Sequence, residues 1–199
     1  HVMLLETESL AENLDDPNQL QSARSAFTAG KHAAAVARSL LALARKESPR
    51  TSLVNATELM TTCRPLIRRI VFNQLECVFD VEADAWSVEV ERQQLEAALI
   101  NLSINARDAM PHGGTLRVSV RNLPRGEPLP AEVPPGDYVS FCVDDSGIGM
   151  SPAVLARATE AFFTTKDSKG GTGLGLSMSQ AFATRSGGAL HIESEVDRG

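Results

Sequence analysis

The chain is poor in the residues that build disulfide frameworks, histidine metal sites and membrane-spanning helices. Its 199 residues include three cysteines, an odd number, and four histidines, none of them close together in sequence. Widely spaced cysteines without metal-ligand spacing are typical of thiols in a reducing compartment, and the scattered histidines argue against a histidine-based metal site. The longest apolar runs are far shorter than the roughly 18 residues that a membrane span needs. We therefore expect a cytoplasmic protein, with membrane contact only through segments outside this sequence.

Basic charge and the common nucleotide-binding motifs are also missing. The 19 lysines and arginines are outnumbered by 25 aspartates and glutamates, which leaves a net charge of −6. Such a balance gives no electrostatic footprint for nucleic acid, so we expect no nucleic-acid partner. The sequence has neither a P-loop motif nor protein-kinase signatures, and the glycines near residue 173 have the wrong spacing for a dinucleotide fingerprint. Any nucleotide site must be of another kind.

Residues 1–47 are predicted to form an antiparallel helical hairpin. Asp16 is a good N-cap, and Pro17 suits the first position of the second helix. Apolar residues then repeat through four heptads, with one core position at Leu20, Phe27, Ala34 and Leu41 and the other at Ala23, Gly30, Ala37 and Ala44. The apolar stripe is wider than a lone hairpin can bury. We expect a homodimer that forms a four-helix bundle, and packing against the rest of the same chain is the alternative.

Residues 55–199 are predicted to form a separate α+β domain, after a boundary near Pro49. Helical patterns cover residues 55–70 and 91–110 and resume after Leu174, and Pro65 predicts a kink or an early end of the first helix. Alternating patterns predict strands at residues 75–81, 86–90, 115–121, 138–143 and 189–194. This order of elements favours an α/β sandwich, with helices on one face of a mixed sheet.

Three polar residues share one face of the helix predicted at residues 91–110. Asn101, Asn105 and Asp108 are spaced by four and three residues, which places them on a single stripe. Asparagine is unfavourable in the middle of a helix, so the presence of two asparagines there indicates a specific role for their side chains. A carboxamide oxygen is a suitable ligand for Mg²⁺, which prefers hard oxygen donors. The alternative is that these asparagines only tie down neighbouring backbone groups.

A glycine-rich stretch precedes the last predicted helix. Glycines at 170, 171, 173 and 175 allow the backbone to approach a ligand closely, and the start of the helix presents unpaired N–H groups and partial positive charge. This combination predicts a phosphate site, although an isolated glycine cluster is also compatible with an ordinary surface loop.

Two further segments complete the candidate site. Asp145, with Gly147 and Gly149, follows an apolar strand, where its carboxylate can accept a hydrogen bond from an exocyclic amino group such as that of adenine. The same segment is compatible with an ordinary turn. Residues 162–166 (Phe-Phe-Thr-Thr-Lys) join two rings, which could anchor a loop over the site, to a lysine that could reach phosphate. A hydrophobic anchor with a solvated lysine is the alternative there.

Taken in order, these blocks resemble the catalytic, ATP-binding domain of bacterial sensor histidine kinases of the GHKL superfamily. The resemblance assigns an N box to residues 101–109, a G1 box to 145–149, an F box to 162–166 and a G2 box to 171–176. The hairpin at residues 1–47 is similar to the family's dimerisation and phosphotransfer domain. One departure is Thr159, before Glu160, where related sequences usually have phenylalanine, and it implies weaker anchoring of the lid.

The resemblance implies a set of ATP-binding residues. They are Asn101, Asn105, Asp108, Asp145, Gly147, Gly149, Met150, Phe163, Thr164, Thr165, Lys166, Gly171, Thr172, Gly173, Leu174, Gly175 and Leu176. Asp145 would recognise adenine, Asn105 would hold Mg²⁺, and residues 150–173 would form a lid. Asn101 and Lys166 would take the catalytic positions. Asn101 stands where hydrolysing members of the superfamily place a glutamate base, and an amide cannot take a proton from water, which favours transfer over hydrolysis.

The resemblance also implies a reaction and its partners. The γ-phosphate of Mg-ATP would pass to a histidine and then to an aspartate in the receiver domain of a response regulator. Neither His1 nor His32 stands at the family's acceptor position, so we expect the acceptor histidine to be missing from these 199 residues. The alternative is a nucleotide-binding pseudokinase or phosphotransfer scaffold. A serine kinase of the anti-sigma type shares the ATP-binding fold, but the predicted hairpin argues against it.

Overall fold

The computed structural model describes residues 51–71, 75–130, 133–166 and 171–199, which belong to the second of two units, Pro49–Gly199. The predicted hairpin at residues 1–47, its dimer and Gly170 lie outside the described residues. Among the helices that are described, none combines the length and apolar character required to cross a membrane.

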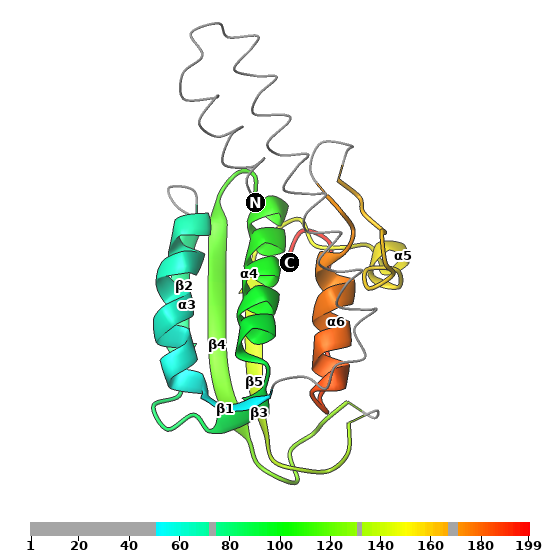
Figure 1. Cartoon of the computed structure of the whole chain (residues 1–199). Coiled ribbons are helices and arrows are strands. Elements are labelled where there is room, and N and C mark those ends of the chain that lie inside the picture. The colour runs from blue at the N-terminus through cyan, green and yellow to red at the C-terminus, as the bar shows by residue number, and fades with distance from the viewer. Residues whose placement is uncertain (1–50, 72–74, 131–132, 167–170) are drawn as a thin grey trace, which may run out of the picture. The chain divides into compact units, whose positions relative to one another are not determined.

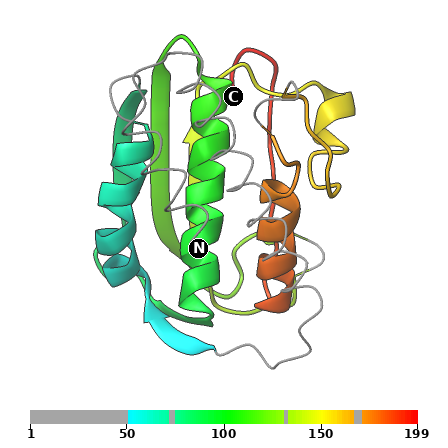
Figure 2. The same cartoon turned by 45° about the horizontal axis from the view of Figure 1, so that its top comes forward.

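Strands and helices are interspersed along the described part, and a layer of helices lies on one side of a sheet (Figure 1). In chain order the elements are β1 (Ser52–Asn55), α3 (Ala56–Ile70), β2 (Leu75–Val81), β3 (Ser87–Val90), α4 (Arg92–Ala109), β4 (Gly114–Leu123), β5 (Tyr138–Asp145), α5 (Pro152–Leu155) and α6 (Gly175–Arg185). Helix α4 packs between α3 and α6, as both views show (Figure 2). The predicted α+β class and the layer of helices over a mixed sheet are confirmed.

Strand β4 is the centre of the main sheet. It pairs in parallel with β2 and antiparallel with β5, so the strand order is β2-β4-β5. Leu116, Val118 and Val120 of β4 are fully buried, whereas Arg117 and Arg121, in the opposite phase of the strand, are exposed; Ser119, between Val118 and Val120, is also buried. This period of two puts the apolar side chains against the helices and the arginines on the open face. The core therefore lies between β4 and the helical layer.

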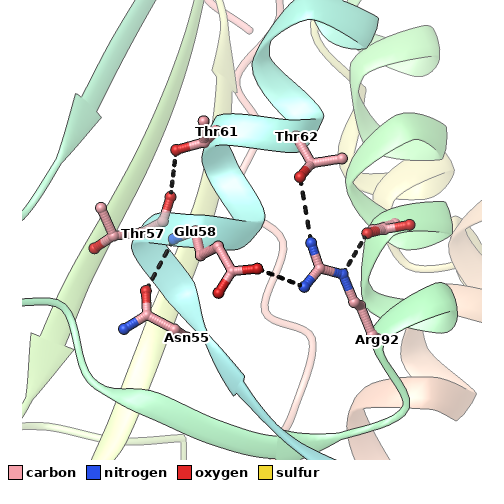
Figure 3. A network of polar contacts seen from close by, with 7 residues as sticks. Asn55, Thr57, Glu58, Thr61, Thr62 and Arg92 are labelled. Atoms are coloured by element: carbon pink, nitrogen blue, oxygen red, sulfur yellow. Dashed lines mark hydrogen bonds and ion pairs between the residues drawn. The ribbon is translucent and has the colours of Figure 1, made fainter.

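A polar network fixes the start of α4 against α3 (Figure 3). Asn55 caps α3 by accepting a hydrogen bond from the Glu58 N–H at 2.9 Å. The Arg92 guanidinium lies 3.3 Å from Glu58 Oε1, donates to Thr62 Oγ1 at 3.2 Å, and donates to Glu96 Oε1 at 2.9 Å. Because Arg92 begins α4, this network orients the helix whose second half carries the predicted site residues.

The structure differs from the sequence-based expectation at three places. Helix α3 continues through Pro65 to Ile70, so the early end did not occur. Strand β1, which pairs antiparallel with β3, was not expected. The strand predicted at residues 189–194 is wrong: in the part of the chain that the structure describes, no backbone hydrogen bond joins residues 189–193 to β5. Burial still alternates there, because Leu190 and Ile192 are half-buried, and this alternation explains the misleading sequence pattern.

Candidate functional site

The second half of α4 carries the polar stripe that the sequence predicts. Asn101, Asn105 and Asp108 are all half-buried, and the apolar side of the helix is buried against the core. The start of α6 lies directly beside this stripe. A methyl group placed on Gly175 would lie 3.6 Å from Asn105 Nδ2 and 3.8 Å from Asn101 Cβ. The structure thus brings the asparagines and the glycine-rich helix N-terminus together, although they are about 70 residues apart in sequence.

Lys166 reaches the same stripe from the F box. Its ammonium Nζ lies 2.6 Å from Asp108 Oδ2 and 3.3 Å from Asn105 Oδ1. Arg107 contacts the other oxygen of the same carboxylate, with Nη2 at 2.6 Å and Nε at 2.9 Å from Asp108 Oδ1. Burial disfavours the ionised form of Asp108, but the hydrogen bonds from Lys166 and Arg107 outweigh it and lower the pKa of Asp108. Two cations and one carboxylate leave one net positive charge here.

Asp145 ends strand β5 at the other side of the site. Its Oδ1 accepts a hydrogen bond from the Gly147 N–H at 2.9 Å. Burial raises the pKa of Asp145, while the bond from Gly147 acts in the opposite direction. A methyl group on Gly147 would lie 2.6 Å from the Ala109 carbonyl oxygen, so this position tolerates no side chain. The Ile148 N–H donates to that same carbonyl at 3.0 Å, which fastens the G1 segment to the end of α4.

The C-terminal segment packs on the G1 segment. A methyl group on Gly149 would lie 2.0 Å from the Glu195 carbonyl oxygen. The Met150 N–H donates to Ser194 Oγ at 2.8 Å, and the Asp197 N–H donates to the Ile148 carbonyl at 2.9 Å. These contacts explain why a glycine is needed at 149, and they involve residues that motif spacing could not have indicated.

The F box and the G2 glycines are neighbours. The Phe162 N–H donates to the Gly173 carbonyl at 2.9 Å, and Gly173 has φ +64° with Phe162 backbone 2.3 Å from where a methyl group would stand. A methyl group on Gly171 would lie 2.4 Å from Thr164 Oγ1 and 3.3 Å from Lys166 Cβ. The close approach of these backbones requires glycine at 173.

The two phenylalanines of the F box have different surroundings. Phe162 is 63% exposed and does not act as a buried anchor. The ring of Phe163 is covered by the Arg157 guanidinium at 4.2 Å, and Arg157 also pairs with Glu160 at 2.9 Å. Arg157 thus joins two parts of the lid on either side of Thr159, where the sequence implied weaker anchoring, and only the structure reveals this contact.

The remaining predicted residues line the same region. Thr165 is exposed, Leu174 is buried at the start of α6, and Leu176 lies in the first turn of that helix. The Thr172 hydroxyl accepts a hydrogen bond from the Leu174 N–H at 3.4 Å. Arg107 and the Ala109 carbonyl were not among the predicted site residues. For Arg107, a basic residue directly beside Asp108 was the available signal.

The donor set suits a hard cation held by amide oxygen and phosphate. Within the described ranges, no cluster of three or more histidine, cysteine, aspartate or glutamate residues could hold a metal ion. Asn105 Oδ1 already accepts a hydrogen bond from a cation, the Lys166 ammonium, at 3.3 Å. An oxygen that attracts an ammonium ion is a chemically suitable ligand for Mg²⁺, which keeps its other positions for water and phosphate.

Comparisons with known proteins agree with this arrangement. Residues 90–199 match the family model "Histidine kinase-, DNA gyrase B-, and HSP90-like ATPase". The sensor kinase CckA of Brucella abortus is 38% identical over 170 residues, which cover 84% of this chain and 18% of CckA. The chain therefore spans about a fifth of the length of that relative.

Solved structures share the fold. ShkA superposes with a TM-score of 0.69 at 19% identity over 94% of this chain and 37% of ShkA. Histidine kinase ThkA gives a TM-score of 0.58 at 20% identity over 89% of this chain and 48% of the ThkA chain. The family is one of ATP-binding domains. This chain belongs to the histidine kinase-, DNA gyrase B- and HSP90-like ATPase family.

Proposed function

We propose that this chain binds Mg-ATP and transfers its γ-phosphate to a histidine, from which the phosphoryl group passes to an aspartate of a response regulator. The observation that carries the proposal is the convergence of three segments on the second half of α4. They are the G1 segment at the Ala109 carbonyl, the start of α6 at Asn101 and Asn105, and Lys166 at Asp108.

Asp145 is proposed to recognise the adenine base. Its carboxylate stands at the end of β5, half-buried, with one oxygen held by the Gly147 N–H. A carboxylate oriented in this way accepts a hydrogen bond from an exocyclic amino group, and partial burial strengthens the interaction. Gly147 and Gly149 have no side chains, so the backbone of this segment can pack closely against the end of α4 and against residues 194–199.

The phosphates are proposed to lie between α4 and the start of α6. The helix N-terminus offers unpaired N–H groups and partial positive charge, and the Arg107–Asp108–Lys166 cluster adds a net positive charge beside it. Asn105 would hold Mg²⁺, which supplies charge neutralisation to the transferring phosphoryl group when it is bound. Asn101 and Lys166 would position the triphosphate. Because the Asn101 carboxamide cannot accept a proton from water, hydrolysis is disfavoured relative to transfer.

The proposed partners follow from the relatives. ThkA was solved in complex with the response regulator TrrA, and ShkA in complex with AMPPNP, which supports the same two ligand classes for this chain. We propose residues 1–47 as the dimerisation hairpin and residues 55–199 as the catalytic domain, with a homodimer as the active form. Use of ATP and a response regulator would place the domain in the cytoplasm.

The test is incubation with Mg-ATP that carries a labelled γ-phosphate, followed by a search for acid-labile label. The chain is assayed alone and with a separate histidine phosphotransfer domain, and nucleotide binding is followed by calorimetry in parallel. Acid-labile label on either histidine-bearing protein supports the kinase. Nucleotide binding without transfer would favour the pseudokinase or scaffold alternative. Failure to bind ATP or ADP would overturn the nucleotide site itself.

A further inference from the structure

Asp108 is the one acidic member of the predicted ATP-binding stripe, and a carboxylate repels phosphate. Both of its oxygens are used by cations: Oδ2 lies 2.6 Å from Lys166 Nζ and Oδ1 lies 2.6 Å from Arg107 Nη2. We propose that Asp108 is a positioning residue that does not contact the nucleotide but holds the Lys166 ammonium in place for the γ-phosphate. The inference rests on the proposed function and assigns a role within that site.

The hydrogen-bonding capacity of lysine fits this role. An ammonium group has three N–H donors. One is directed to Asp108 Oδ2 at 2.6 Å, and a second to Asn105 Oδ1 at 3.3 Å, the oxygen that Mg²⁺ would take when it is bound. Among the described residues no further acceptor contacts the ammonium, so its third N–H can meet a phosphate oxygen and the ion pair with Asp108 need not break when the nucleotide binds. The Lys166 side chain is 34% exposed, which leaves its ammonium accessible to a ligand.

Arg107 keeps the carboxylate in a fixed orientation. It donates to Asp108 Oδ1 through both Nε and Nη2, which leaves Oδ2 directed at Lys166. The lowered pKa of Asp108 keeps the carboxylate charged at neutral pH. Lysine has a long, flexible side chain that loses rotamer entropy when it binds a ligand, and a fixed partner orders the side chain before the ligand binds.

The position of the Arg107–Asp108–Lys166 cluster beside the G2 glycines fits a contact with the γ-phosphate. A methyl group on Gly171 would lie 3.3 Å from Lys166 Cβ, and one on Gly175 would lie 3.6 Å from Asn105 Nδ2, so Lys166 and Asn105 both lie beside the G2 glycines. A cation at the glycine-rich end would favour a nucleotide with a γ-phosphate over one without it.

The test compares ATP and ADP affinities by calorimetry, with Mg²⁺ present throughout. The proteins are the unchanged chain, Asp108→Asn, Lys166→Gln, Lys166→Arg and the double variant Asp108→Asn/Lys166→Gln. We expect each single variant except Lys166→Arg to bind ATP about tenfold more weakly and ADP less than threefold more weakly, as loss of one charged hydrogen bond predicts. The double variant should be no weaker than the worse single variant, because both act through one contact. Lys166→Arg should retain part of the preference for ATP.

The sign of the Asp108→Asn effect is diagnostic. Simple electrostatics predicts tighter ATP binding once a carboxylate near the phosphates is removed, whereas positioning predicts weaker binding. Tighter or unchanged ATP binding by Asp108→Asn would overturn the inference, as would additive losses in the double variant. Asp80→Asn is the matched control, since it breaks an exposed ion pair with Arg121 on the open face of the sheet. If the unchanged chain binds neither nucleotide, the proposed function fails and this role fails with it.

Discussion

The two sides of α4 make different kinds of contact. Towards α3 and β4, buried apolar side chains such as Leu59, Leu99 and Val118 fill the space between helix and sheet. Towards the G1 segment and α6, the contacts instead depend on positions without side chains, such as Gly147 and Gly175. On the first side stability depends on side-chain volume, and on the second the ligand site depends on backbone that can approach closely. One helix therefore serves both the core and the candidate site.

The largest expected effect is on the core side. Leu99 is 1% exposed in the middle of α4, so Leu99→Ala should lower the free energy of unfolding by about 3 kcal/mol, measured by urea denaturation. ATP affinity of the folded fraction should stay within twofold. The matched control is Leu53→Ala, because Leu53 is 76% exposed and its removal should cost less than about 0.5 kcal/mol. A large loss of ATP affinity in Leu99→Ala would contradict the separation of the two sides.

The next effect concerns the adenine end. Asp145→Asn should weaken ATP and ADP binding equally, by about 2 kcal/mol or roughly thirtyfold, because a charged acceptor is lost. Calorimetry with both nucleotides measures it. Asp144→Asn, which changes the exposed neighbouring carboxylate, is the control and should leave both affinities nearly unchanged. Equal binding by Asp145→Asn and the unchanged chain would show that the adenine ligand is another group.

Asn105 offers a way to separate the metal from the nucleotide. Asn105→Ala should remove most of the dependence of ATP affinity on Mg²⁺, a loss of about tenfold at saturating Mg²⁺, since one hard oxygen ligand disappears. The measurement is a magnesium titration of ATP binding. An unchanged titration curve would exclude Asn105 as the magnesium ligand, even if overall affinity fell.

A pair of glycines tests whether close approach or conformation matters on the ligand side. Gly173→Ala places a methyl group 2.3 Å from Phe162 backbone and should weaken ATP binding about fivefold. Gly126 also has positive φ, +107°, but a methyl group there meets nothing within 4 Å. Gly126→Ala should therefore lower stability by about 1 kcal/mol without changing ATP affinity. The same loss of affinity in both variants would argue against the contact with Phe162.

The smallest expected effects are the opposite pH dependences of Asp108 and Asp145. The ordinary pKa of both is 3.8, lowered in folded Asp108 and raised in folded Asp145. Asp108 therefore stabilises the fold above pH 3.8 and loses this contribution as pH falls through its lowered pKa. The contribution of Asp145 is complete below pH 3.8 and is lost as pH rises through its raised pKa.

Thermal unfolding of the ligand-free chain between pH 7 and pH 3 measures these effects. At pH 7, Asp108→Asn should be slightly less stable than the unchanged chain and Asp145→Asn slightly more stable, each by about 2 °C. Both differences should shrink on acidification. A lower melting temperature for Asp145→Asn at pH 7 would mean that the ionised carboxylate stabilises the fold, contrary to its raised pKa.

The sequence predicted most of the fold because local patterns specify it. The helix at α4 and the strands β2, β4 and β5 follow from apolar periodicity and were placed within a few residues. The strand at residues 189–194 failed because alternating burial does not require a hydrogen-bonded neighbour. Strand β1, only four residues long, carries too little pattern to be recognised.

The candidate site was predictable in part for a different reason. Asn101, Asn105 and Asp108 share a helix, so their spacing alone places them together. The distances from Lys166 to Asp108 and from Gly147 to Ala109 join segments far apart in the chain, and no local pattern contains them. The contact of Arg157 with Phe163 likewise depends on how the lid turns back on itself.

Strand β4 pairs with β2, which precedes it in the sequence, and with β5, which follows it. These pairings constrain the order in which the elements of this domain can form. Thr115 of β4 meets Glu76 of β2 across 39 positions, and β5 follows a further loop. Because long loops must close before such pairs form, α3 and α4 can form before the sheet does. During synthesis β4 gains its second partner only as β5, which begins at Tyr138, is added. Until then an unpaired strand edge is exposed, and nascent chains that pause at this point can pair with one another.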